Sequence, residues 1–587
     1  MKTLIRLFLV IAIFGFVYCS KNLQHNAINQ NHYATIMKNF NKDFSPCNQF
    51  YPYVCSQWTE KHLDGRYTSK MDMIRYNGNW EIQRYLKKTS LDEMPKCAQL
   101  VKNFYESCVG TEEFNYMGFV NYLEKEEKMT WALFTPTANR DVVFDWPTTM
   151  AIFRKYGLND MFIDQWIGSS KDFKLVDSTD MKFLNKSIAL PSGTMNFMEL
   201  DELIDDFETE LLLAQVSNGN EKTFKFQELP YTWLKRYLTR LIGAEKLNVN
   251  MEFNMRNVEG MDALDKLLKK YDDKFICRYL EVRFLLYLQK ADKMTKANKM
   301  TTDKQNIKAN ECMTQTTALL TPATEWILSQ LHPELLDDIP QMQQIFDNIV
   351  KGLSKTLRMH KNVIIPDYLI ENLDTIQLQV GNLPQSHNAA EVLKYVYESL
   401  NLQNNNYYSN YLNILKYHFE SELNYATDML INIPTSDIPI YDIGPKYELP
   451  LNRLVLPFSV LRQPIYHPAL ENIFKQSSLG TLMAQQILDG MTISKTRDTS
   501  YLEYITSLHT SFDVFFSSLE PKEAERLKTM FGLSSLRQLK KMFFINAIHY
   551  RCEKDYEYAE VVNSMLMHLS DFNEAFDCKL NMFLKNF

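Results

Sequence analysis

Apolar residues recur at intervals of three and four over most of this chain, and this spacing constrains the fold more than any other feature. Between about residues 66 and 430 the pattern is visible in runs such as Leu100–Cys108 and Tyr279–Leu288. Such spacing places apolar side chains on one face of an α-helix. The segment 453–461 is the exception, because it is apolar, β-branched and bounded by proline, so we expect a strand there. The sequence therefore predicts a mainly helical protein.

The composition excludes several classes of protein. The chain has 587 residues, of which 45% are hydrophobic, enough to bury one large core or two ordinary ones. Its formal net charge is −7 and its basic residues are scattered, so we expect no nucleic-acid partner. Aromatic residues make up 13% of the chain and glycine occurs only 17 times, which argues against disorder and against a repetitive β architecture.

The N-terminus has the features of a secretory signal. Lys2 and Arg6 are followed by an apolar run at residues 7–17, and the small residue Cys19 suits the position before a cleavage site. We therefore expect residues 1–19 to be removed and the protein to be secreted, with no stable membrane span. The alternative is a membrane anchor through residues 7–17, although this run is well short of the roughly 20 residues that cross a bilayer.

Cleavage after Cys19 would leave an even number of cysteines, which behind a secretory signal implies disulfides formed in an oxidising compartment. No C-x-x-C pair is present, which argues against a zinc ribbon or a thioredoxin-type redox motif. Asn185 begins the sequon Asn-Lys-Ser, so we expect a glycan there. The eight cysteines are Cys47, Cys55, Cys97, Cys108, Cys277, Cys312, Cys552 and Cys578.

Four segments of the chain share their pattern with one family of proteins. They are Cys47–Trp58, Asn452–Pro468, Phe543–Cys552 and Asp571–Cys578. Together they resemble the neprilysin/endothelin-converting-enzyme family of zinc metallopeptidases. The resemblance runs from about residue 40 to the C-terminus and is clearest at the two ends.

This resemblance implies a mainly α fold of two lobes around a central cavity. One lobe would be large and helical, and the other a degenerate form of a thermolysin-like catalytic lobe. With the leader at residues 1–19, we expect a flexible segment at 20–44, the helical lobe at 45–430 and the degenerate catalytic lobe at 431–587.

The resemblance also implies disulfide partners. Cys47 would join Cys578, Cys55 would join Cys552, and Cys108 would join Cys312. Cys97 and Cys277 are then left over, and we expect them to pair by elimination.

In this family a glycine-led helix after the proline-containing run carries the motif H-E-x-x-H-G. Zinc hydrolysis needs three protein ligands, an open position for water and a base, and this motif supplies two ligands and the base. Here Gln485 stands for the first histidine, Gln486 for the glutamate and Asp489 for the second histidine, while Gly490 remains. A neutral amide is a weak zinc ligand and cannot act as a base. We therefore expect that zinc is lost and that no other cofactor replaces it.

The other catalytic elements of the family are altered as well. The segment 511–515 resembles the one that follows the third zinc ligand, and counting back puts Ser500 at the ligand glutamate and Tyr504 at a supporting aspartate. The family's Asp-x-His…Arg element should fall within residues 553–562, which contain neither His nor Arg.

The substrate-binding Asn-Ala-Tyr/Phe-Tyr of the family is also replaced, here by Gly444, Pro445, Lys446 and Tyr447. Pro445 lacks the backbone N–H that an edge-strand contact to a peptide could use. With five catalytic elements missing or altered, the sequence predicts no hydrolysis.

The sequence thus predicts a secreted, non-catalytic member of this family. Such a protein could bind peptides without cutting them or pair with an active neprilysin-like relative. The first alternative is a working zinc endopeptidase, the activity that the resemblance alone would imply. The second is an extracellular structural or carrier protein with an empty cavity.

Overall fold

The computed structural model describes most of the chain after the first 23 residues, and all statements below refer to these described residues. They are 24–38, 40–62, 67–111, 115–137, 139, 141–159, 161–166, 169–171, 188–214, 219–293, 304–359, 367–383, 388–427, 444–492, 497–554 and 557–579. The predicted leader at residues 1–19, the sequon at Asn185 and the predicted lobe boundary at 430 and 431 lie outside them. None of the described helices is both long and apolar enough to cross a lipid bilayer.

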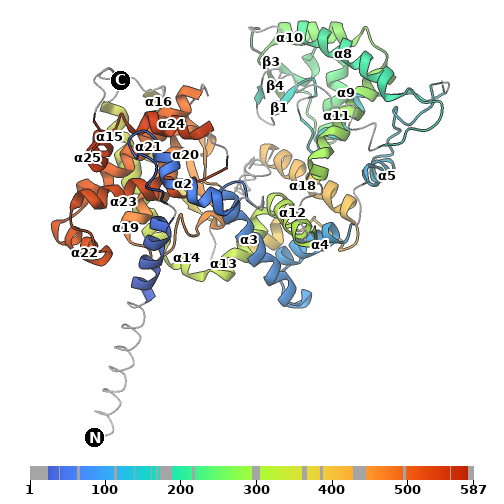
Figure 1. Ribbon diagram of the computed structural model, residues 1–587. Helices are drawn as coiled ribbons and strands as arrows, with labels where there is room; N and C mark the ends of the chain where they lie inside the picture. The colour runs from blue at the N-terminus through green and yellow to red at the C-terminus, as the bar shows by residue number, and fades with distance from the viewer. Residues whose placement is uncertain are drawn as a thin grey trace. The chain divides into compact units, whose positions relative to one another are not determined.

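Contacts within the chain define two compact units, and neither is a single continuous segment. Unit 1 consists of Met1–Thr89, Thr321–Gln385 and Asp442–Phe587, and unit 2 of Ser90–Leu320 and Ser386–Tyr441. Both units are mainly helical, as the apolar spacing predicts, with only short strands (Figure 1).

Unit 1 contains a helix at residues 24–38 and the next two helices in sequence, together with elements from the middle and the end of the chain. The elements used below are α2 (Phe50–Lys61), α3 (Lys70–Lys88), α13 (Thr321–Leu331), α15 (Ile339–Met359), β5 (Gln377–Val380), β6 (Lys446–Glu448), β7 (Arg453–Leu456), η5 (Phe458–Val460), α19 (Asn472–Lys475), η6 (Gln476–Gly480), α20 (Thr481–Met491), α21 (Arg497–Ser518), α22 (Pro521–Phe531), α23 (Leu536–His549), α24 (Glu557–Leu566) and α25 (Ser570–Phe576).

The core of unit 1 joins the two ends of the chain. Phe50 on α2 packs edge-on against Phe572 and Phe576 on α25, with ring centroids 4.9 and 5.0 Å apart. The disulfides Cys47–Cys578 and Cys55–Cys552 close the same region, as the resemblance implies. Cross-links that bring residues so distant in sequence together reduce the conformational freedom of the unfolded chain.

The residues before α2 are not the flexible segment that the polar composition suggested. Residues 24–38 form a helix with Asn29, His32 and Ile36 buried. Asn29 Nδ2 donates to the Ala469 carbonyl at 2.7 Å, and Asn29 Oδ1 accepts from the Glu471 backbone N–H at 2.8 Å. The prediction of flexibility was therefore wrong here, because these polar side chains bond to the backbone of a distant segment.

A three-stranded sheet of unit 1 has the order β5-β7-β6. Strand β7 pairs in parallel with β5 and antiparallel with β6, and Tyr447 lies opposite Leu454. The strand predicted at 453–461 is present but ends at Leu456, where Pro457 precedes the short helix η5. The Glu325 carboxylate on α13 accepts hydrogen bonds from the backbone N–H groups of Phe458 and Ser459 at 2.5 and 3.2 Å. These two N–H groups therefore bind a side chain and not a neighbouring strand.

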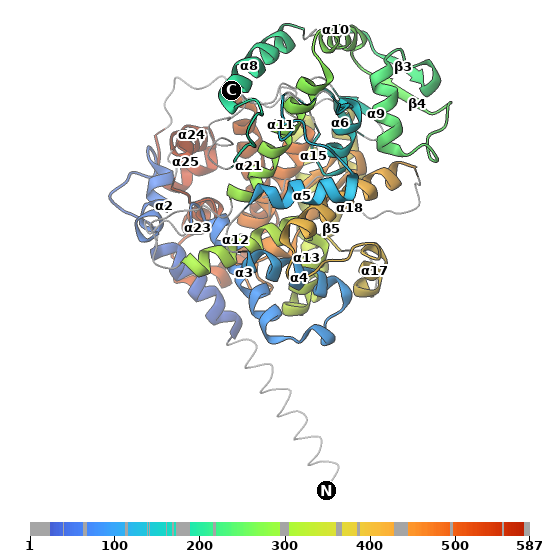
Figure 2. The same ribbon diagram turned by 90° about the vertical axis from the view of Figure 1, so that its right-hand side faces the viewer.

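Unit 2 is built around long helices, with two short antiparallel strand pairs. Helix α6 packs against both α9 and α11 (Figure 2). The elements used below are α4 (Lys96–Gly110), α5 (Tyr116–Glu127), α6 (Trp146–Lys155), α9 (Thr232–Ile242), α10 (Val258–Leu268), α11 (Asp273–Lys293), α12 (Lys304–Leu319), α17 (Ala389–Val396) and α18 (Tyr407–Thr427).

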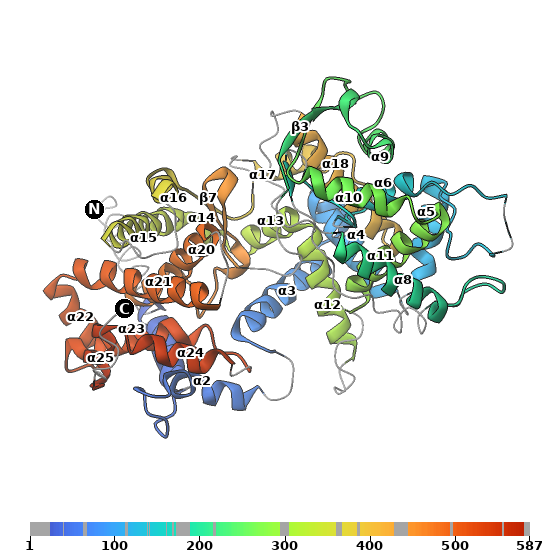
Figure 3. The same cartoon turned by 90° about the horizontal axis from the view of Figure 1, so that it is seen from above.

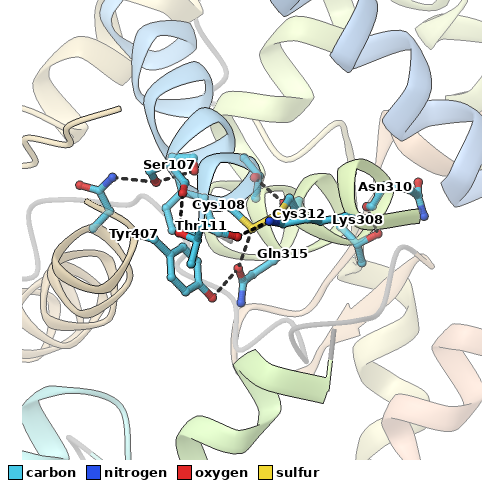
Figure 4. The surroundings of a disulfide bond; sticks show 12 residues. Ser107, Cys108, Thr111, Lys308, Asn310, Cys312, Gln315 and Tyr407 are labelled. Carbon is cyan, nitrogen blue, oxygen red and sulfur yellow. Dashed lines mark hydrogen bonds between the residues drawn. A yellow bond between two sulfur atoms is a disulfide. The ribbon is translucent and has the colours of Figure 1, made fainter. Parts of the chain in front are cut away.

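The disulfide Cys108–Cys312 links α4 to α12, as the resemblance implies (Figure 4). Polar side chains surround it: Tyr407 donates its hydroxyl to Gln315 Oε1 at 3.0 Å, and Lys308 donates to the Thr111 carbonyl. The packing of α4 against α12 therefore combines a covalent link with hydrogen bonds.

The fourth predicted disulfide is absent. Cys97 and Cys277 are both free and buried. Cys97 lies on α4, which packs against α12, α17 and α18, whereas Cys277 lies on α11, where its sulfur is 3.6 Å from Thr149 Oγ1 of α6. Pairing by elimination failed because each thiol is packed among different helices, and a buried cysteine behaves as a small apolar residue.

Candidate functional site

The altered peptidase motif lies on one continuous helical segment at residues 472–491. It begins as α19, passes through the π-helical turn η6 and continues as α20. Ser478 Oγ donates within this turn to the Ile465 or the Phe474 carbonyl, both at 2.6 Å, and Ser477 Oγ is 2.7 Å from the Ile473 carbonyl. Single π-turns of this kind occur frequently at functional sites.

Helix α20 places the three altered positions as the motif requires. Gln485 and Asp489 are four residues apart, so their side chains leave the same face of the helix, with Gln486 beside them. All three side chains are half-buried, whereas Ile487 and Leu488 are fully buried. Gln485 Oε1 is buried without a hydrogen-bond partner among the described residues.

Helix α21 packs along α20 and carries the two positions expected for the third ligand and its supporting residue (Figure 3). Ser500 and Tyr504 lie one turn apart on α21. The Ser500 side chain is outside the described part of the chain. Tyr504 is buried, its hydroxyl has no hydrogen-bond partner among the described residues, and burial raises its pKa.

Arg551 is a residue of this region that the sequence reasoning missed. Its guanidinium lies 4.3 Å from the centroid of the Tyr504 ring, and its Nε donates to the Tyr550 hydroxyl at 3.1 Å. The expected position of the cation was residues 553–562, a range that begins two residues after Arg551. The signal was available, because Arg551 directly precedes Cys552, which a disulfide holds in the core.

The residues at the family's substrate-binding position lead into strand β6, which is the last strand in its sheet's order: Gly444 and Pro445 precede it, and Lys446 and Tyr447 begin it. Pro445 and Tyr447 are buried, and Gly444 and Lys446 are half-buried. The Tyr447 hydroxyl donates to Asn452 Oδ1 at 2.7 Å, and burial raises the pKa of Tyr447. The ring lies against Gly490 of α20, so the structure brings the 444–447 segment and the altered motif together.

Comparisons with known proteins show what the chain is similar to in sequence and in fold. Residues 46–202 match the family model described as Peptidase family M13. Neprilysin-1 of Caenorhabditis elegans is 20% identical over 540 residues, which covers 78% of this chain and 69% of that protein. These matches support membership of the neprilysin-like M13 family.

Solved structures place the M13 fold on almost the whole chain. The Haemonchus galactose-containing glycoprotein complex aligns with a TM-score of 0.64 at 13% identity, covering 94% of this chain and 96% of that one. The zinc metalloprotease Zmp1 of Mycobacterium tuberculosis, solved with an inhibitor, aligns with a TM-score of 0.62 at 11% identity over 92% and 96% of the two chains. The predicted mainly α fold of this family is thereby confirmed.

The residues of this chain do not fit the zinc ion that the M13 family implies. Zinc in proteins is bound by cysteine, histidine and carboxylate side chains. The motif helix offers two amides and the single carboxylate of Asp489. Within the described ranges, no group of three or more His, Cys, Asp and Glu side chains is placed to hold a metal ion. No catalytic step can be derived through zinc at this position.

Proposed function

We propose that this chain is an extracellular member of the neprilysin-like family that binds extended peptides without hydrolysing them. The observation that carries the proposal is the replacement of both histidines and the glutamate on α20 by Gln485, Asp489 and Gln486. Amide groups cannot take a proton from water at neutral pH, so they cannot replace the base of the family's mechanism. The family fold is retained while the groups that activate water are not.

Peptide binding is supported by the position of β6 in its sheet. An extended peptide can add a strand to a sheet edge, where backbone hydrogen bonds provide affinity and pockets select side chains. Pro445 offers no N–H for such pairing, so we expect one hydrogen bond fewer than an ordinary edge strand would make. The apolar ring of Tyr447, which lies against α20, would form one side of such a site.

An extracellular location is supported by the disulfides. Three are present, and disulfides persist in oxidising compartments and are rare in the cytosol. The leader at residues 1–19 and the sequon at Asn185 point the same way in sequence. The aligned Haemonchus protein is named as a glycoprotein complex, and we propose that this chain is also glycosylated.

Equilibrium dialysis of the full chain against a mixed pool of peptides, read by mass spectrometry, tests this function. We expect intact peptides to be retained and no fragments to appear. Pro445→Ala restores a backbone donor and should tighten binding by roughly 2- to 10-fold, the range expected for one hydrogen bond. Pro521→Ala, at the first position of α22, is the matched control and should leave binding unchanged.

Three other results would each reject peptide binding without hydrolysis. Fragments in the pool would indicate a working endopeptidase. No retained peptide would favour an extracellular structural or carrier protein. Retention only when an active neprilysin-like relative is added would indicate that the chain acts by pairing with that relative.

A further inference from the structure

Helix α8 (Phe197–Leu213) of unit 2 is fixed to the core through its inner face (Figure 2). On that face, Phe207 packs edge-on against Tyr279 of α11, with ring centroids 4.9 Å apart. Glu208, at the border of the face, accepts the Tyr279 hydroxyl at 3.3 Å and lies 3.5 Å from the Arg283 guanidinium. These contacts account for the position of the helix in unit 2. They do not involve its outer face.

The outer face of α8 is acidic. Four of its side chains are exposed carboxylates, namely Glu199, Glu202, Asp205 and Asp206. Among the described residues, none of these four takes part in a hydrogen bond or an ion pair through its side chain, and α8 itself contains no lysine or arginine. A carboxylate in the first turn, such as that of Glu199, stabilises a helix N-terminus. Asp205 and Asp206 lie in the middle of the helix, where aspartate is a poor helix former, so helix stability does not explain them.

Large apolar side chains stand at both ends of this acidic face. Met198, in the first turn, is 77% exposed, and Leu213, the last residue, is 79% exposed, with Leu212 beside it at 53%. Steps of three or four residues lead from Met198 through Glu202 and Asp206 to Leu213, so these side chains share one side of the helix. The two apolar ends are about 22 Å apart at 1.5 Å per residue. The outer face therefore has an acidic centre between two apolar ends.

The charge of the outer face decides which kind of partner fits it. A second copy of the same face would bring like charges together, which is unfavourable at an interface. A lipid surface fits poorly as well, because helices that lie on membranes carry lysine and arginine on their polar face and are attracted to anionic lipids. A partner helix with basic side chains opposite the carboxylates is complementary in charge, and apolar side chains at its ends would cover Met198 and Leu213.

We propose that the outer face of α8 is a docking surface for a basic amphipathic helix of another polypeptide, with lysine or arginine at its centre and apolar residues at both ends. The carboxylates attract this helix and set its register, and the apolar ends contribute buried area. The surface is separate from the extended-peptide site proposed above, because α8 belongs to unit 2 and β6 to unit 1.

Fluorescence anisotropy of a labelled synthetic helix with the full chain tests the surface. The probe has about 18 residues, enough to span the two apolar ends, with lysines in its central turns and leucines at both ends. We expect saturable binding that weakens as sodium chloride is added. The double variant Glu202→Gln, Asp206→Asn should weaken binding by about 3- to 10-fold, as expected for two exposed ion pairs. Leu213→Ser should weaken it by about 10-fold through lost apolar burial.

The matched controls change exposed side chains of the same kinds elsewhere in unit 2. They are the double variant Glu124→Gln, Asp141→Asn and the single variant Val249→Ser, and both should bind the probe like the parent chain. Pro445→Ala in unit 1 should also leave binding of this probe unchanged, which separates the surface on α8 from the site at β6. All the altered side chains on α8 are exposed, so these variants should fold as well as the parent protein.

Several results would overturn the proposal. They are equal binding by the parent chain and the Glu202→Gln, Asp206→Asn variant, no binding by the parent chain, and equal binding of a probe with glutamates in place of its lysines. Sedimentation velocity of the chain without the probe covers the remaining occupant. A dimer of the parent chain that Leu213→Ser dissociates would assign the face to a second copy of this chain and would also overturn the proposal.

Discussion

The ring of Tyr447 lies against the backbone of Gly490, so closely that a Cβ built on Gly490 would be 2.5 Å from Tyr447 Cδ1. This contact joins β6, at the substrate-binding position of the family, to α20, which carries the altered motif. Gly490 is therefore needed here for close approach of a side chain, whatever has happened to the catalytic residues.

Gly490→Ala should destabilise the protein by about 1–3 kcal/mol, because the added methyl group forces Tyr447 to move within a packed core. Urea unfolding followed by tryptophan fluorescence measures the change. Gly110→Ala is the control, since nothing lies within 4 Å of a Cβ at that position. Adding Tyr447→Ala should recover part of the loss in Gly490→Ala, and wild-type stability of Gly490→Ala alone would refute the contact.

The buried His32 predicts that acid destabilises unit 1. Its Nε2 donates to Asn546 Oδ1 at 2.9 Å, and Asn546 Nδ2 donates at 3.1 Å to the Phe474 carbonyl on α19. Burial lowers the pKa of His32 from 6.5 to about 4. The unfolded chain therefore binds more protons between these values, and stability falls as the pH is lowered from 6.5 to 4.

This shift corresponds to about 3 kcal/mol lost across that range, and His549, whose pKa burial also lowers, adds to the loss. Urea unfolding at pH 7 and pH 4.5 measures it. His32→Gln cannot take up a proton and should lose less stability on acidification than the parent chain does. An equal loss in both proteins would show that His32 does not titrate as its burial implies.

The free cysteines predict a specific labelling pattern. Alkylation of the native protein should label neither Cys97 nor Cys277, because both are buried and burial raises the pKa of both thiols, that of Cys97 to about 11. Alkylation after unfolding without a reductant should label both. The six cysteines of the three disulfides are the internal control and should require a reductant. A peptide linking Cys97 to Cys277 would contradict the structure.

Restoring the motif on α20 tests the assignment of Ser500. The triple variant Gln485→His, Gln486→Glu and Asp489→His should bind zinc only weakly, because two ligands do not complete a tetrahedral site. Adding Ser500→Glu should raise the affinity by at least about 10-fold if α21 presents this position to α20, since each tenfold corresponds to about 1.4 kcal/mol. Zinc titration with a chromogenic competitor measures the difference. Thr510→Glu, further along α21, is the control substitution, and equal gains from both would refute the assignment.

The sequence predicted the features that depend on local spacing or on a family pattern. The three- and four-residue spacing indicated the helices, and the resemblance to the family indicated three of the disulfides. Helix α20 begins and ends around the motif as expected, since Gln485 and Asp489 keep the helical spacing of the residues they replace.

The features that were missed depend on contacts between distant residues. The polar segment around Asn29 and His32 looked flexible because its partners, such as Glu471 and Asn546, are more than 400 residues away. The contact of Arg551 with Tyr504 likewise joins separate helices, although the position of Arg551 directly before Cys552 offered a signal. Cys97 and Cys277 were predicted to pair only because the other cysteines already had partners. A buried cysteine is stable as a free thiol among apolar side chains, so this argument was wrong.

We propose above that this chain, which resembles a family of zinc peptidases, does not perform zinc hydrolysis. The most direct test is the zinc content of the purified full chain, measured by elemental mass spectrometry alongside cleavage of a peptide pool with and without a chelator. We predict no stoichiometric zinc and no chelator-sensitive cleavage. One zinc per chain, with cleavage that a chelator abolishes, would contradict the account and would require ligands other than those on α20.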